Sequence, residues 1–82
     1  MAQKFSKSKQ SRRKPSWAVA PEWAHYRVLD RDGEWLWHEE EPEIDSRCVV
    51  WTSEGQMEHA AWETDPEVLA GWKTSCEERP PV

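Results

Sequence analysis

The chain has 82 residues, a net charge of −5 and seven tryptophans, but only one phenylalanine and one tyrosine. A chain of this length forms one small domain that buries proportionally little surface, so its tryptophans must supply much of the core. The sequence contains neither an apolar stretch near the roughly 20 residues of a membrane span nor a Gly-rich phosphate-binding loop. We therefore expect no association with membranes and no nucleotide chemistry.

The N-terminal sixteen residues carry six basic side chains and no acidic one. Such a segment cannot bury enough apolar surface to offset its ordering entropy, so we predict a disordered basic arm over residues 1–16. Two roles fit this arm: it neutralises the phosphates of a nucleic acid, or it only keeps the protein in solution. In the first role the contacting residues are Lys4, Lys7, Lys9, Arg12, Arg13 and Lys14.

The rest of the chain has the opposite charge. Residues 21–82 contain all sixteen acidic residues and five basic ones, for a net charge of −11. A body of this charge repels phosphate, which argues against nucleic acid as the main partner. We divide the chain into the arm, a small Trp-rich β domain over residues 17–76 and a frayed C-terminus over residues 77–82.

A β-hairpin is the central predicted element, with strands at about residues 25–30 and 34–40. Asp32-Gly33 lies between two aromatic-rich segments, and Asp-Gly in this setting is a strong hairpin signal. The second strand contains Trp35 and Trp37, which share one of its faces.

Two registers of this hairpin fit the sequence, and they differ in which residues stand beside the two tryptophans of the second strand. A two- or four-residue loop places Tyr26 and Val28 there. A three-residue loop with a bulge at Gly33 places Arg27 and Leu29 there instead.

Two further strands and a helix complete the predicted domain. Residues 44–52 contain the β-branched and aromatic run of a buried strand, and residues 57–62 form a weaker strand after a turn at residues 53–56. The simplest arrangement is a four-stranded antiparallel meander of two hairpins. Capping residues followed by Pro66 predict a short helix over residues 64–72, so the fold class is mainly β with α+β character.

Neither a metal site nor nucleophilic catalysis is indicated. The three histidines and two cysteines contain no pair with the close spacing of a structural zinc site. Cys48 is predicted in an apolar strand and Cys76 beside acidic residues, and both settings disfavour the reactive thiolate. We therefore expect two reduced thiols, no metal, no cofactor and no enzymatic activity.

The tryptophans and the acidic run after the hairpin are the candidates for a partner-binding surface. Six tryptophans in residues 21–82 are many for one small sheet, and exposed Trp is enriched at binding hot spots. We select Trp35 and Trp37, for which packing in the core is the alternative. Glu39, Glu40 and Glu41 extend this surface, unless they form a solvated edge that prevents pairing with other sheets.

A resemblance adds a biological setting. The pattern Pro21-Glu22-Trp23-Ala24, then Asp30-Arg31-Asp32-Gly33-Glu34-Trp35-Leu36-Trp37, then Pro42, resembles a group of small, mostly uncharacterised proteins of tailed phages and prophages, over about a quarter of the chain. The resemblance implies an accessory protein in the host bacterial cytoplasm and assigns no catalytic residue.

Taken with the charge pattern, the resemblance predicts a non-enzymatic protein that docks an acidic, Trp-bearing surface on a host protein. Inhibition of a host defence factor or a nucleic-acid-handling factor is one form of such docking. The alternatives are a nucleic-acid-binding protein that uses the basic arm and exposed Trp, and a minor structural component of the virion.

Overall fold

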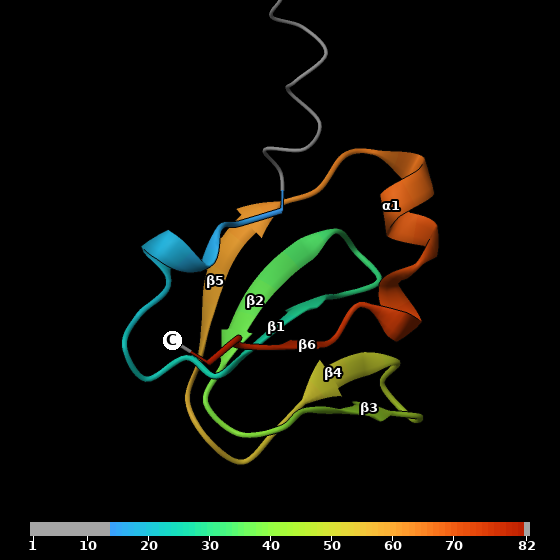
Figure 1. Cartoon of the computed structure of the whole chain (residues 1–82). Helices are drawn as coiled ribbons and strands as arrows, with labels where there is room; N and C mark the ends of the chain where they lie inside the picture. The colour runs from blue at the N-terminus through green and yellow to red at the C-terminus, as the bar shows by residue number, and fades with distance from the viewer. Residues whose placement is uncertain (1–13, 82) are drawn as a thin grey trace, which may run out of the picture.

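The structure, a computed structural model, describes residues 14–81 (Figure 1). Its main feature is a four-stranded antiparallel sheet in the order β5-β2-β1-β6, and a separate antiparallel hairpin joins β3 and β4. The strands are β1 (Tyr26–Leu29), β2 (Glu34–His38), β3 (Glu43–Asp45), β4 (Val50–Thr52), β5 (Met57–Trp62) and β6 (Glu77–Glu78). The helical segments are η3 (Trp17–Val19), α1 (Pro66–Ala70) and η4 (Trp72–Thr74).

The predicted mainly β class and the antiparallel sheet are confirmed, but the meander order is not observed. The predicted fourth strand is β5, and it pairs with β2. The predicted third strand is divided into β3 and β4 by a turn. In this turn Val49 has φ of 56°, which a β-branched residue rarely adopts. Hydrogen bonds from the N–H of Val49 to the Asp45 carbonyl (2.6 Å) and from the N–H of Arg47 to the Asp45 carboxylate (2.9 Å) support the turn.

The β1–β2 hairpin adopts the bulged register. Gly33 has φ of 97°. Its N–H donates a 2.9 Å hydrogen bond to the Asp30 carbonyl, and the N–H of Asp30 donates a 2.9 Å hydrogen bond to the Glu34 carbonyl. Arg27 and Leu29 therefore stand opposite Trp37 and Trp35, respectively. A non-Gly residue at the αL position would be strained, so glycine at this one position selects between the two registers.

The sheet face that contains Trp35 and Trp37 lies under the segment before the first strand. Pro15 is buried, and its carbonyl accepts a 2.6 Å hydrogen bond from the guanidinium of Arg27. The ring of Trp17 lies 5.3 Å from that of Trp37. Residues 14–16, which were assigned to the basic arm, thus belong to the folded domain, and residues 1–13 lie outside the described residues.

The β3–β4 hairpin and the C-terminal helical segments close the rest of the core. The Asp30 carboxylate accepts a 2.9 Å hydrogen bond from the backbone N–H of Trp51, and the Trp51 indole donates to the carbonyl of Trp72 over 3.1 Å. The two tryptophans join Val28, Leu29, Trp35 and Leu36 in one buried cluster. In the predicted helix, the Asp65 side chain caps α1 at the N–H of Glu67 (2.9 Å).

Residues 77–79 are paired rather than frayed. Glu77–Glu78 forms β6 against β1. The guanidinium of Arg79 donates 2.9 Å hydrogen bonds to the carbonyls of Pro21 and Ala24. The Glu77 carboxylate forms ion pairs with Arg27 and Lys14. The local composition of this segment predicted fraying because its partners lie about fifty or more positions earlier in the chain.

Candidate protein-binding surface

Trp35 and Trp37 are core residues. Their exposed fractions are 2% and 3%, and the indole N–H of Trp35 donates a 3.0 Å hydrogen bond to the buried Glu63 carboxylate. The prediction that these tryptophans form an exposed contact surface is therefore contradicted. The physical reason is the N-terminal segment, whose Lys14 and Trp17 lie over their rings.

Trp62, at the end of β5, is the exposed tryptophan. Its exposed fraction is 56%, whereas the other six tryptophans of the chain are buried or half-buried. Its ring lies 5.2 Å from that of His59, and His59 Nδ1 lies 2.9 Å from a carboxylate oxygen of Glu34. Met57, 52% exposed, lies on the same strand.

The sequence contains a signal for this exposure that our prediction did not use. Residues 57–62 include Glu58, Ala60 and Ala61 and no β-branched residue, a composition unlike that of a strand buried on both faces. Such a strand belongs at the edge of a sheet, where a tryptophan has fewer neighbours to cover it.

β5 forms an open edge of the sheet. It pairs with β2 on one side and with no other described strand, and with six residues it is the longest strand described. The opposite edge is β6, which has two residues. The pairing of β5 with β2 shifts register between Trp35 and Leu36, so that Ala60 has no direct partner and forms a β-bulge.

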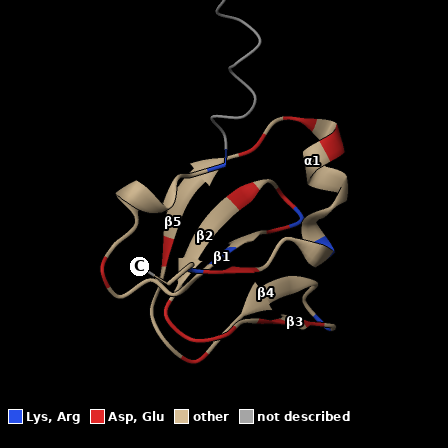
Figure 2. Cartoon of the chain, in the orientation of Figure 1, with Lys and Arg blue, Asp and Glu red and all other residues tan. Residues whose placement is uncertain are grey.

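The part of the sequence that contains β5 is acidic. Residues 48–72 contain five carboxylates and neither Lys nor Arg, and Figure 2 shows acidic positions on β5 and in the loops below it. The carboxylates are Glu54, Glu58, Glu63, Asp65 and Glu67. Across residues 14–81 the net charge is −10 with neutral histidines.

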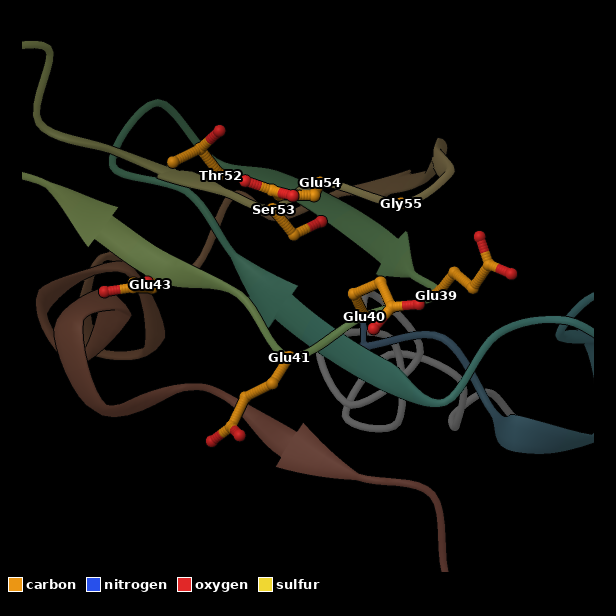
Figure 3. A pocket seen from close by; sticks show the side chains of 8 residues that line it. All are labelled: Glu39, Glu40, Glu41, Glu43, Thr52, Ser53, Glu54 and Gly55. Carbon is orange, nitrogen blue, oxygen red and sulfur yellow. The ribbon is translucent and has the colours of Figure 1, made fainter.

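An acidic hollow of about 660 Å³ lies at the other end of β5, and it contains all three predicted contact glutamates (Figure 3). The carboxylate of Glu39 accepts a 3.0 Å hydrogen bond from the N–H of Gln56, whereas Glu40 and Glu41 are exposed. Figure 3 shows the carboxylates of Glu39, Glu41 and Glu43 pointing in different directions. The hollow therefore presents dispersed negative charge rather than a converging set of ligands. Its lining is Glu39, Glu40, Glu41, Glu43, Thr52, Ser53, Glu54 and Gly55.

The thiols differ from each other in their surroundings. Cys48 is exposed in the turn between β3 and β4, so its prediction as part of a buried strand is wrong. Cys76 is half-buried, and burial together with the nearby Glu41, Glu77 and Glu78 raises the pKa of its thiol. This shift disfavours a nucleophilic thiolate at Cys76.

Neither a metal-binding group nor a membrane-spanning helix is found in the described part of the chain. No group of three or more His, Cys, Asp or Glu side chains within residues 14–81 is placed to hold a metal ion. No helix in the same range is long and apolar enough to cross a lipid bilayer. Comparison of the chain with protein-family models, curated proteins and solved structures found no match.

Proposed function

We propose that the chain is a non-enzymatic, phage-encoded binding protein that docks an acidic surface bearing Trp62 on a protein of the bacterial host. The observation that carries this proposal is the 56% exposure of Trp62 at the acidic edge of the sheet. A large aromatic side chain left in solvent by a domain with so small a core has a cost in lost burial, and Trp is the residue type most enriched at interface hot spots.

The chemistry of the surface indicates the class of partner. Trp62 and the adjacent ring of His59 supply an aromatic anchor, Met57 lies exposed at the start of the same strand, and the carboxylates of Glu34 and Glu58 form an acidic rim. An anchor with such a rim resembles the centre and periphery of a protein interface. The rim attracts a positively charged surface and increases the rate of encounter with it.

A protein partner fits this charge better than a nucleic acid. The body carries −10 over residues 14–81, which repels phosphate, and Lys14 is engaged by Glu77 at 2.6 Å. The other arm residues, Lys4, Lys7, Lys9, Arg12 and Arg13, lie outside the described residues. A basic groove that normally binds nucleic acid is a suitable target, and its occupation would inhibit a host defence or nucleic-acid-handling factor.

Affinity capture from a bacterial lysate, with and without nuclease, tests the proposal. The bait is the full chain, compared with Trp62→Ala and with Val19→Ala, which truncates another exposed apolar side chain (72%) on η3. After nuclease treatment we expect wild type and Val19→Ala to retain the same protein in equal amounts. We expect Trp62→Ala to retain at least about tenfold less of that protein. Equal capture by folded Trp62→Ala, or capture that nuclease abolishes, would contradict the proposal.

A further inference from the structure

We propose that the partner adds an extended, basic segment to the open edge of β5 as a fifth strand of the sheet. This inference rests on the proposed function, because it assigns a binding mode and a chemical class to the partner of the same surface. Strand addition uses main-chain hydrogen bonds for affinity and the side chains of the edge strand for specificity.

The alternation of hydrogen bonds between β2 and β5 shows which main-chain groups are available. Glu39 donates its N–H to the carbonyl of Gln56 (2.9 Å), and Glu63 donates its N–H to that of Gly33 (2.7 Å). In an antiparallel ladder, residues alternate between groups directed to the partner strand and groups directed away from it. Together with the register of the two strands, these bonds direct the N–H and C=O groups of Met57, His59 and Trp62 to the open side.

These same three residues have exposed side chains, as does Glu58 between them. Met57 is opposite His38, His59 is opposite Leu36 and Trp62 is opposite Glu34, and all three are exposed. A strand that pairs with β5 would thus bring its own side chains beside those of Met57, His59 and Trp62. The edge therefore offers main-chain donors, acceptors and an apolar surface at one place.

Charge selects a basic strand as the occupant. β5 carries the exposed Glu58 within its length, the exposed Glu54 precedes it, and the segment from residue 48 to residue 72 has no Lys or Arg. Alternating Lys or Arg side chains on an added strand would lie among these carboxylates.

A second copy of this chain is a poorer occupant. Each copy carries −10 over residues 14–81, and antiparallel pairing of two β5 strands would bring two Glu58 carboxylates into one short ladder. The negative charge that disfavours self-association favours a strand of opposite charge at this edge.

A peptide of three alternating Lys and Val pairs, acetylated and amidated, is the probe. Its matched control is the same peptide methylated on every backbone nitrogen, which keeps the charges and removes the N–H donors. A second control replaces each Lys by Glu. Binding to the full chain is followed by amide NMR spectra and by hydrogen exchange.

Strand addition predicts that the Lys–Val peptide protects the amides of Met57, His59 and Trp62 from exchange. It also predicts that the affinity of the Lys–Val peptide is at least about tenfold higher than that of the methylated peptide. The Glu peptide is expected not to bind. Absence of binding by the Lys–Val peptide would overturn the inference, as would equal binding of the methylated peptide. Protection of β5 that depends on protein concentration without peptide would identify a second copy instead and would overturn it too.

The variant His59→Pro separates this inference from the proposed function. Proline at an edge position whose N–H is directed away from the sheet leaves the β2–β5 hydrogen bonds in place, and a thermal melt checks that the variant folds. Strand addition predicts loss of peptide binding and of partner capture. If His59→Pro captures the lysate partner as well as wild type while Trp62→Ala does not, the proposed function stands and strand addition fails. If the proline variant does not fold, the methylated peptide decides the question alone.

Discussion

The indole N–H of Trp35 donates a 3.0 Å hydrogen bond to one carboxylate oxygen of Glu63, and both residues are buried. The other oxygen of Glu63 accepts a 3.1 Å bond from the N–H of Asp65, the cap of α1. The backbone N–H of Glu63 donates to Gly33 in the hairpin turn. One residue thus connects the core, the start of the helix and the turn that fixes the register.

Removal of the Glu63 carboxylate is expected to destabilise the domain. Glu63→Ala leaves the Trp35 indole and the Asp65 amide without their acceptor, and a buried unsatisfied donor costs about 1–3 kcal/mol. We expect a loss of about 2 kcal/mol in the free energy of unfolding, measured by urea denaturation, and a smaller loss for Glu63→Gln, which retains an acceptor oxygen. Glu67→Ala, at an exposed position, is the control. A Glu63→Ala variant as stable as wild type would show that this hydrogen bond contributes nothing.

Gly33 is expected to be the least replaceable glycine. Its φ is 97°, and a Cβ at this position would lie 2.9 Å from the backbone oxygen of Glu63. Both strain and crowding therefore oppose Gly33→Ala, for which we expect a loss of about 1–3 kcal/mol.

Gly71→Ala is the matched control for Gly33→Ala. Its Cβ would lie 3.6 Å from the nearest carbonyl oxygen, and its φ of −96° is accessible to alanine. We expect a change within about 0.5 kcal/mol at this position. Equal urea midpoints for the two variants would contradict the role assigned to Gly33.

Burial of His38 predicts a loss of stability on acidification. His38 has no exposed surface; its Nδ1 lies 2.8 Å from Ser53 Oγ, and its Nε2 has no hydrogen-bond partner among the described residues. Burial lowers the pKa of His38 from its ordinary value of 6.5. The unfolded chain therefore binds a proton at a higher pH than the folded chain, so stability decreases as the pH falls below about 6.5.

His38→Asn tests this prediction, because asparagine keeps a polar group near the position of Nδ1 and does not titrate. We expect its stability to be lower than that of wild type at pH 7.5, and the difference to narrow as the pH falls to 5.5. Urea denaturation between pH 7.5 and pH 5.5 measures how the free energy of unfolding of each protein changes with pH. Parallel curves would mean that His38 titrates alike in the folded and unfolded chains.

Local chemistry explains which parts of the fold were predictable. The αL glycine at position 33 and the capping carboxylate of Asp65 act within a few residues, so the hairpin and the helix follow from short motifs. The partner of the second strand is different, because the sequence of residues 57–62 contains no feature that favours β2 over a nearer strand. Which strand pairs with β2 depends on how the whole core packs.

The exposure of each tryptophan depends on equally distant contacts. Trp35 is covered by Lys14, which lies 5.9 Å above its ring and 21 positions earlier, in a segment whose composition indicates disorder. Trp62 has no such cover because it lies on an edge strand. The net negative charge of the body is visible in the sequence, but the predicted acidic contacts Glu39, Glu40 and Glu41 line a separate hollow. The exposure of Trp62 depends on the strand order.

We expect the charge of Glu77 to stabilise the paired C-terminal strand β6. Burial raises the pKa of the Glu77 carboxyl, but hydrogen bonds from Arg27 and Lys14 outweigh this effect and lower the pKa below its ordinary value of 4.5. A lowered carboxyl pKa contributes stability above about pH 4.5, and this contribution is lost as the pH falls through the folded value. Because the Glu77 side chain is 41% exposed, we expect Glu77→Gln to cost only about 1 kcal/mol at pH 7.

Glu78→Gln, the next residue on β6, is the matched control because Glu78 is exposed. It removes the same charge without removing the bonds to Arg27 and Lys14, so we expect a change within about 0.5 kcal/mol. Urea denaturation at pH 7 and at pH 3 measures both variants against wild type. The deficit of Glu77→Gln should shrink at pH 3, where the wild-type carboxyl is also becoming protonated. A deficit that is the same at both pH values would show that Glu77 stabilises β6 through packing and not through its charge.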